Sequence, residues 1–322
     1  MVICSVCGKN QAIFFQKHSG RRLCRECFIN DIRYRVKEQI SRYSMISSGD
    51  RVVVGVSGGK DSYVVLHILS EIVNPNNIIG VMIDEGIAGY TREDMYIAVR
   101  KFCSDIGVDC IYVSMEKILG FSVDRFMKFY LEYAKENNVY SISACTYCGI
   151  ARRRILNMYA RELKANKVVT GHNLDDEIQT YIINIIRGDV MRLAQLHPLS
   201  ETHSDKLVKR VKPLRSIYEY ESTYYAYLLG YTFQEYECPY IVTRPTLRTK
   251  VRDVLIELEK LYPGVQLKLL EFLDNTIANI LVKPRIALPT CKICGEPTSP
   301  NRSICKFCEL VEDIKKILHK LY

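Results

Sequence analysis

Several features that would define other protein classes are missing from this chain of 322 residues. The chain has no tryptophan. It also has no apolar run of about 18 residues, so we expect no membrane-spanning helix and no role at a membrane. The first residues, M-V-I-C-S-V-C-G, lack the charged and apolar regions of a secretory signal. Low-complexity tracts are also missing, which argues against a fibrous or disordered chain. These absences predict a globular cytoplasmic protein.

Cysteine, by contrast, is abundant, with 13 residues. In a chain without an export signal, such a number favours metal binding over disulfides. Two groups each consist of two C-x2-C pairs, separated by sixteen residues in one group and by ten in the other. Four thiolates close the coordination shell of a zinc ion, so both sites are predicted to be structural zinc ribbons. The first group is Cys4, Cys7, Cys24 and Cys27, and the second is Cys291, Cys294, Cys305 and Cys308.

A third group has only three members. Cys145 and Cys148 lie in S-A-C-T-Y-C-G, and Cys238 follows much later in E-Y-E-C-P-Y. Three thiolates on a metal centre leave one position open, which is what catalysis requires. A persulfide on one cysteine, resolved by another, is the alternative use of the same trio. The remaining two, Cys103 and Cys110, are expected to be small buried hydrophobic residues.

The segment R-V-V-V-G-V-S-G-G-K-D-S, residues 51–62, predicts a buried strand, a glycine turn and the start of a helix. The first N–H groups of a helix have no intrahelical partner, and the helix dipole adds positive potential, so this junction suits an anion such as phosphate. Gly58 and Gly59 allow the backbone to approach a ligand closely, and Lys60 adds a cation. The Walker A spacing is absent, which indicates a phosphate loop of another kind.

S-G-G-K-D-S after a hydrophobic strand resembles the PP-loop of the ATP pyrophosphatase superfamily, whose members split ATP into AMP and pyrophosphate and adenylate a carbonyl oxygen. With the three cysteine groups, the chain as a whole, from Cys4 to Cys308, is similar to the tRNA 2-thiouridine synthetase family. The resemblance implies binding of ATP with Mg²⁺, two structural Zn²⁺ ions and tRNA. It also implies a [4Fe–4S] cluster on Cys145, Cys148 and Cys238, whose fourth iron carries the sulfur to be transferred.

The pattern after residue 50 alternates between strands and helices, which predicts an α/β fold with a parallel, doubly wound sheet. Strands are expected at 51–56, 77–83, 108–113 and 167–170, and helices at 60–72, 90–106, 122–136, 149–164, 174–187 and 218–229. Further helices are expected at 31–45 and in the tail at 310–321. The predicted domains are a zinc ribbon (1–28), a linking helix (29–48), a PP-loop domain of the adenine nucleotide alpha hydrolase-like type (49–283), and a second ribbon with a tail helix (284–322).

The resemblance also assigns roles to individual residues. It implies that the nucleotide cradle comprises Val56, Ser57, Gly58, Gly59, Lys60, Asp61 and Ser62, together with Ile83, Asp84, Arg152, Gly171 and Asp176. Asp61 is expected to hold Mg²⁺, Ile83 and Asp84 to contact adenine and ribose, and Arg152 to contact the phosphates. Asp176, in G-H-N-L-D-D-E, is expected to act as an acid, a base or a metal partner, although a carboxylate at a helix start also stabilises the helix dipole. Arg153 and Arg154, which follow Arg152 in the sequence, are expected to lie at the surface or to contact RNA.

The predicted reaction is adenylation of the C2 oxygen of a uridine in tRNA, followed by its replacement with sulfur. The segments C-T-Y-C-G-I-A-R-R and I-I-R-G-D look more like the branch of the family that modifies the wobble position, U34, than like the branch that modifies T54. A net charge of +9 is consistent with a polyanionic partner, and basic residues gather in 206–215 and 244–252. The sulfur donor stays open between a ubiquitin-like thiocarboxylated carrier and free sulfide, and a homodimer is possible. A non-catalytic zinc-ribbon tRNA-binding protein is the alternative of a different class.

Overall fold

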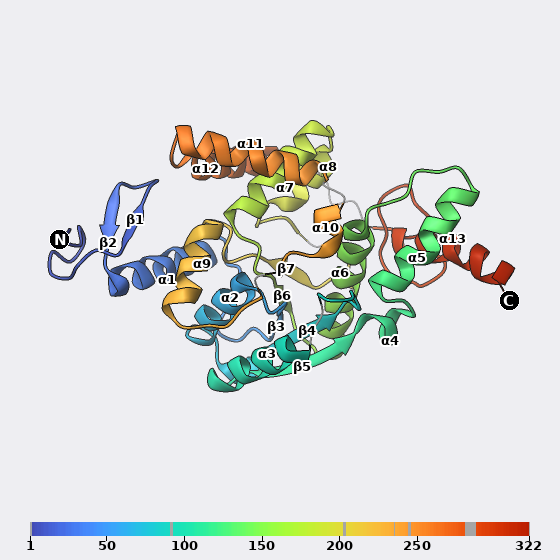
Figure 1. The fold of residues 1–322 in the computed structure, drawn as a ribbon, viewed down its shortest axis with the longest axis horizontal. Helices are drawn as coiled ribbons and strands as arrows, with labels where there is room; N and C mark the ends of the chain where they lie inside the picture. Colours follow the sequence, from blue (N-terminus) through green and yellow to red (C-terminus); the bar gives the residue numbers. More distant parts are fainter. Residues whose placement is uncertain are drawn as a thin grey trace.

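The computed structural model describes residues 2–90, 93–201, 204–234, 236–243, 246–280 and 288–321. Its centre is a five-stranded sheet in the order β5-β4-β3-β6-β7, and all neighbouring strands are parallel (Figure 1). The strands are β3 (Val52–Gly55), β4 (Ile78–Asp84), β5 (Asp109–Ser114), β6 (Lys167–Val169) and β7 (Lys209–Val211). The predicted parallel α/β fold is confirmed. Strand β7 was not predicted, because its three residues lie in a segment rich in charge.

The strand order reverses between β3 and β6. From β3 the chain adds β4 and β5 on one side, and it then returns to add β6 and β7 on the other. In an open parallel sheet the crevice at such a reversal, beyond the carboxyl ends of the strands, is where ligands bind. The loops after β3 and β6 carry the motifs S-G-G-K-D-S and G-H-N-L-D-D-E, so the two signatures lie on either side of this crevice.

Helices cover both faces of the sheet, because successive residues of a strand point to opposite sides. Val52 and Val54 belong to a core with one set of helices, while Val53 belongs to a second core with another set. The first set comprises α1 (Arg25–Arg42), α2 (Lys60–Ser70), α3 (Glu93–Asp105) and α9 (Glu219–Leu228). The second comprises α4 (Met115–Leu119), α5 (Val123–Glu136), α6 (Ala144–Glu162) and α13 (Lys306–Leu321).

The N-terminal module consists of the hairpin β1 (Phe14–Gln16) and β2 (Arg21–Leu23), followed directly by α1. The predicted start of this helix, at residue 31, was wrong: α1 begins at Arg25, so Cys27 belongs to its first turn. The module is fastened to the body through Glu221 of α9, which is fully buried. Gln16 donates to Glu221 at 2.9 Å, and Arg35 donates to both of its oxygens at 2.8 Å.

A layer of helices lies above the β6–β7 side of the sheet: α7 (Leu174–Ile186), α8 (Val190–Leu196), α11 (Leu247–Leu261) and α12 (Val265–Ile280). The buried guanidinium of Arg215 fixes α12 to the body, since it donates two hydrogen bonds to Asp274. Tyr43 of the segment after α1 donates to the same carboxylate at 2.7 Å. The short elements η1 (Pro75–Asn77) and α10 (Pro239–Thr243) complete the described structure.

The chain ends lie at opposite ends of the molecule (Figure 1). The predicted tail helix is confirmed as α13, which packs against α5 and α6 and buries Leu310, Ile314 and Ile317. The proposed domain boundary at 283/284 and the basic residue Arg244 lie outside the described residues, so both stay predictions. No helix within the described residues is long and apolar enough to span a membrane.

Candidate functional site

The glycine turn after β3 is braced by its own side chains. The loop leaves the sheet at the buried Val56, and Gly58 adopts a φ of +78°, which an L-residue rarely tolerates. The Ser62 hydroxyl donates to the carbonyl of Gly59 at 2.7 Å and accepts from the N–H of Ser57 at 3.3 Å. Helix α2 begins at Lys60, so its unpaired N–H groups open onto the crevice of the sheet. This geometry can hold a phosphate group.

Two charged residues of this loop form a small polar network. The Lys60 Nζ lies 2.9 Å from Glu219 Oε1 and 3.3 Å from Asp61 Oδ2. The other oxygen of Asp61, Oδ1, is buried and has no hydrogen-bond partner within the described structure. Burial raises the pKa of Asp61, with the nearby Asp176 adding to the effect. A buried carboxylate oxygen without a partner is a suitable ligand for Mg²⁺, so the residues present fit this ion.

The loop after β6 lies directly against the glycine turn, since Gly171 is in close contact with the backbone of Asp61. Asp176, in the first turn of α7, forms a capping box with Asn173: it accepts from the Asn173 N–H at 3.3 Å and donates its own N–H to Asn173 Oδ1 at 3.1 Å. The structure therefore shows that Asp176 stabilises the start of α7, while its catalytic role stays a prediction. Its Oδ1 also lies 3.6 Å from Arg248 of α11.

Asp175, the neighbour of Asp176, is occupied by structural contacts. Its carboxylate accepts from the N–H of Glu219 at 2.7 Å and from Gln266 Nε2 at 3.1 Å, which joins α7 to α9 and α12.

The carboxylate of Asp176 itself is in a different environment. Burial is the largest effect on its pKa and raises it, while the charge of Arg248 opposes the shift. Asp176 remains partly exposed, with 37% of its side chain accessible, although it lies deep among protein atoms.

A depression with about 330 Å³ of empty space, open to solvent, lies beyond the ends of β3 and β4. It is lined by Ser57, Met82, Ile83, Glu85, Tyr90, Met95, Arg152 and Gln234. Ser57, Ile83 and Arg152 were predicted nucleotide contacts, and the structure brings them together here. Asp84 does not line it, because its carboxylate turns away and accepts from the Gly86 N–H at 2.8 Å. Whether Asp84 contacts a ribose stays a prediction.

Sequence reasoning missed the other five lining residues, among them Glu85 and Gln234. Glu85 shares the face of Ile83, since residues two apart in an extended chain point the same way, and this period could have identified it. Its Oε1 lies 3.6 Å from Arg152 Nε. Gln234 comes from the segment after α9. Its backbone N–H donates to the carbonyl of Gly58 at 3.0 Å. No local pattern marks Gln234, because only the folded chain brings it over the glycine turn.

The first turn of α6 carries the cysteine pair. The predicted helix start, at residue 149, was wrong: Ser143 caps the helix through the N–H of Thr146, so Cys145 and Cys148 lie one turn apart on the same side. Burial raises the pKa of Cys148 to about 12, with Arg152 opposing and Glu85 adding to the shift. Arg152 follows one turn later, and its guanidinium interacts with the Cys148 thiol as well as with Glu85.

Cys238 completes the trio from the residue before α10. Burial raises the pKa of both Cys145 and Cys148, and the charge of Cys238 adds to the shift of both thiols. The three thiols are therefore neighbours in the folded chain. Among the described residues, however, only the two zinc groups have all their sulfur atoms within 4.8 Å of one another. A polynuclear cluster separates the metal atoms that its cysteines bind, so three thiols spaced more widely than in a single-ion site can still hold an iron–sulfur cluster.

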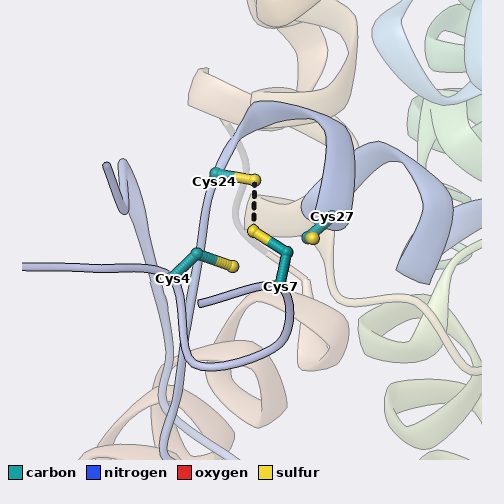
Figure 2. Close-up of side chains that lie close together, drawn as sticks. All are labelled: Cys4, Cys7, Cys24 and Cys27. Atoms are coloured by element: carbon teal, nitrogen blue, oxygen red, sulfur yellow. Dashed lines mark hydrogen bonds between the residues drawn. The ribbon is translucent and has the colours of Figure 1, made fainter. Parts of the chain in front are cut away.

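Each of the two four-cysteine groups gathers its sulfur atoms within 4.8 Å. Figure 2 shows the first group, in which the Cys7 and Cys24 sulfurs are 3.9 Å apart; the corresponding pair of the second group, Cys294 and Cys305, is 3.7 Å apart. A tetrahedral zinc ion with Zn–S bonds of about 2.3 Å requires sulfur atoms about 3.8 Å apart, so both groups fit zinc. Burial opposes the charge, but backbone N–H groups lower the pKa of Cys4 and of Cys291 to about 6.

The second zinc group is joined to the cysteine helix by Arg154, which was predicted to be a surface residue or an RNA contact. Its guanidinium donates to Cys294 Sγ at 3.4 Å and lies over the ring of Phe307, 4.8 Å from the centroid. Arg161, two turns further along α6, binds Glu296 of the same module at 2.5 Å. The C-terminal ribbon is thus held by the same helix that presents Cys145 and Cys148.

Comparison with known proteins places this arrangement in a family. A family model for the PP-loop domain matches residues 30–255, and one for the N-terminal LIM domain of the 2-thiouridine synthetase TtuA matches residues 3–29. The chain is 30% identical to the tRNA 2-thiolation protein NcsA of Haloferax volcanii, covering 98% of this chain and 99% of that protein. It is 32% identical to the cytoplasmic tRNA 2-thiolation protein 1 of Arabidopsis thaliana, covering 99% and 86%.

Among solved structures, the U34-tRNA thiolase NcsA from Methanococcus maripaludis, determined with its [4Fe–4S] cluster, matches with a TM-score of 0.78 and 33% identity. The match covers 97% of this chain and 96% of that one. The similarity therefore includes both terminal cysteine modules as well as the central sheet. On these grounds the chain belongs to the tRNA 2-thiouridine synthetase family of PP-loop proteins.

Proposed function

We propose that this protein is a tRNA-uridine 2-sulfurtransferase that converts ATP to AMP and diphosphate while it replaces the C2 oxygen of wobble uridine 34 with sulfur. The observation that carries the proposal is the position of Arg152. It lines the pocket beside the glycine turn, and on the same helix it interacts with Cys148. A group activated by ATP in this pocket would therefore lie next to the cysteine trio.

The residues of the loop supply the activating half of the reaction. A carbonyl oxygen is a poor leaving group, so it must be joined to the α-phosphate of ATP before sulfur can displace it as AMP. The N–H groups at the start of α2 and the Lys60 ammonium would bind the departing pyrophosphate. Asp61 would hold Mg²⁺ through its unpartnered oxygen, and Arg152 would stabilise charge on the α-phosphate. Asp176 would act at the mouth of the same crevice as the acid or base.

The cysteine trio supplies the second half. Cys145, Cys148 and Cys238 would hold a [4Fe–4S] cluster, which provides an iron without a protein ligand at which a sulfur donor can bind. Arg152 keeps a positive charge beside Cys148, and this favours the thiolate that a metal centre needs. The two zinc ions would have no open position and would stabilise the terminal modules. A cytoplasmic protein that uses a thiocarboxylated carrier or free sulfide as donor would fit this scheme.

The choice of uridine 34 rests on two supports. The solved relative that matches 97% of this chain is a U34-tRNA thiolase. The segments C-T-Y-C-G-I-A-R-R and I-I-R-G-D of this chain favour the same branch. The +9 net charge suits a tRNA substrate.

The test is thiolation of tRNA by protein purified without oxygen, with ATP and sulfide. The modified tRNA is digested and mapped by mass spectrometry, and we expect 2-thiouridine at position 34 and one AMP per sulfur inserted. Sulfur at position 54 would contradict the choice of uridine, and AMP formation without any thiolation would contradict the reaction.

The cluster is tested by comparing Cys148→Ser with Cys103→Ser. Cys103 is more deeply buried than Cys148 and lies in the other core, away from the trio. Iron and acid-labile sulfide should be lost in the first variant and retained in the second, together with thiolation. Full activity of the wild-type protein without iron would exclude the cluster and favour a persulfide.

A further inference from the structure

Arg153 occupies an unusual position for an arginine. It follows Arg152 on α6, and its guanidinium folds back over Gly149, the residue after Cys148. A Cβ atom on Gly149 would lie only 3.3 Å from Arg153 Nη1. The side chain is nevertheless exposed, and within the described residues it makes neither an ion pair nor a hydrogen bond. An unpaired positive charge therefore lies at the open side of the cysteine turn.

A second unpaired arginine lies near it. Arg210 is in the middle of β7, the edge strand of the sheet, and it too is exposed, with no ion pair or hydrogen bond in the described part of the chain. Burial, together with the charge of Arg153, lowers the pKa of Arg210 to about 10. The pKa of Arg153 is also lowered, first by burial and then by Arg152 and Arg192. Asn157, one turn after Arg153 on α6, accepts from the N–H of Val208 at 2.9 Å, and Val208 lies two residues before Arg210. Because residues four apart on a helix and two apart in an extended segment share a face, this contact places Arg153 near Arg210.

Three other cations near this pair already have carboxylate partners. Arg152 lies 3.6 Å from Glu85, Arg192 lies 3.1 Å from Asp189, and Lys212 is paired with Glu177. Two like charges held near each other oppose each other, and no carboxylate in the described structure compensates them. Such an arrangement gains energy when an anion binds between the two guanidinium groups, whose planar donors match phosphate oxygens.

We propose that Arg153 and Arg210 bind a backbone phosphate of the RNA next to the nucleotide that is modified. The inference rests on the proposed function, since it assumes a tRNA substrate. Arg153 does not line the pocket beside the glycine turn, so the phosphates of ATP are served by other residues. A uridine that reaches between that pocket and Cys148 must leave the stack of its neighbours, and its own backbone then passes over the surface where the two arginines lie.

The experiment measures tRNA binding by the intact protein as a function of salt, and steady-state thiolation, for Arg153→Gln/Arg210→Gln. A lost phosphate contact reduces the slope of log K against log salt by about 1, and the two arginines share one phosphate, so the double variant should lose about 1 unit of slope. We expect its KM for tRNA to rise at least tenfold, while its KM for ATP and its zinc content stay as in the wild type. The charge-retaining variant Arg153→Lys/Arg210→Lys should keep most of the slope.

The control removes two surface cations that have partners on their own helices, Lys260→Gln/Lys315→Gln. Lys260 binds Glu257, and Lys315 binds Glu312, both at 2.8 Å. If the control and the double arginine variant lose the same slope, the effect is one of net charge, and the inference is overturned. It is also overturned if the arginine variant raises only the KM for ATP.

Failure of the proposed function would look different. Wild-type protein would then show no thiolation of any tRNA, whatever the behaviour of the variants. If the double glutamine variant does not fold, the single variants Arg153→Gln and Arg210→Gln decide. Each should lower the salt slope and raise the KM for tRNA, and a wild-type slope and KM in both would overturn the inference.

Discussion

A Cβ atom on Gly171 would lie 2.8 Å from the carbonyl carbon of Asp61 and 2.9 Å from its carbonyl oxygen. The loop after β6 and the glycine turn after β3 are therefore in backbone contact across the reversal of the strand order. The φ of Gly171 is not in the left-handed region, so local conformation does not require glycine there. The close approach of another segment requires it, and the two motifs act as one site.

Gly171→Ala should disrupt this contact. The added methyl group meets backbone atoms, which cannot rotate away, so the start of α2 must shift. We expect a loss of about 1–3 kcal/mol in the free energy of unfolding, as for overpacked sites, and a weaker affinity for ATP. Urea unfolding and ATP titration measure the two effects.

Gly49→Ala is the matched control for that variant. A Cβ on Gly49 meets nothing within 4 Å, and its φ is not positive. Its unfolding free energy should stay within about 0.5 kcal/mol of the wild type. Equal losses in both variants would show that the contact between Gly171 and Asp61 has no special importance.

Asp176→Asn separates the capping and catalytic roles of this residue. Asparagine keeps a carbonyl oxygen that can accept from the Asn173 N–H, so the start of α7 should remain intact. Thiolation should nevertheless fall by about 10²–10⁴-fold, as when a general acid or base is removed. Single-turnover thiolation and thermal unfolding are the measurements. A variant with normal activity would limit Asp176 to helix capping.

The charge of Asp61 should cost stability in the free protein. Burial raises its pKa above that of the unfolded chain, so the ionised form opposes folding. This penalty is complete above the folded pKa and disappears as pH falls below the unfolded value of about 3.9. Asp61→Asn should therefore raise the free energy of unfolding at pH 7, and the gain should shrink towards pH 4. Urea unfolding of both proteins across this range tests the sign, and a less stable variant at pH 7 would contradict it.

Arg154→Gln should weaken the C-terminal zinc site alone. The guanidinium donates to Cys294 Sγ and offsets the negative charge of four thiolates, and loss of such an outer contact typically costs about 10–100-fold in metal affinity. Zinc release into a chelator, followed with time, should become faster for one of two zinc ions. Arg22→Gln, near the N-terminal site but bound to no thiol in the described structure, is the control. Faster release of both ions in Arg154→Gln would indicate general unfolding.

Much of the fold and the site could be predicted because the signals are local. The run of valines at 52–54, the glycine turn and the cysteine spacings each lie within a short stretch of chain. Errors occurred where neighbours decide. Helix α6 starts at Ala144 because the Ser143 hydroxyl caps it, although the cysteines and glycine that follow are weak helix formers. Glu85 faces the pocket and Asp84 does not, which depends on how β4 ends.

The sequence by itself determined the chemistry that the chain can offer: a phosphate loop, two closed zinc sites and an open cysteine trio. The phosphate loop and each C-x2-C pair consist of residues a few positions apart, and the covalent chain keeps such residues close in space. Only the tertiary structure decided which of these groups meet. Gly171 touches Asp61, Arg154 reaches Cys294, and Arg153 lies near Arg210, each pair joined across segments far apart in the chain. Packing of the sheet and its helices brings them together, and no local pattern encodes that packing.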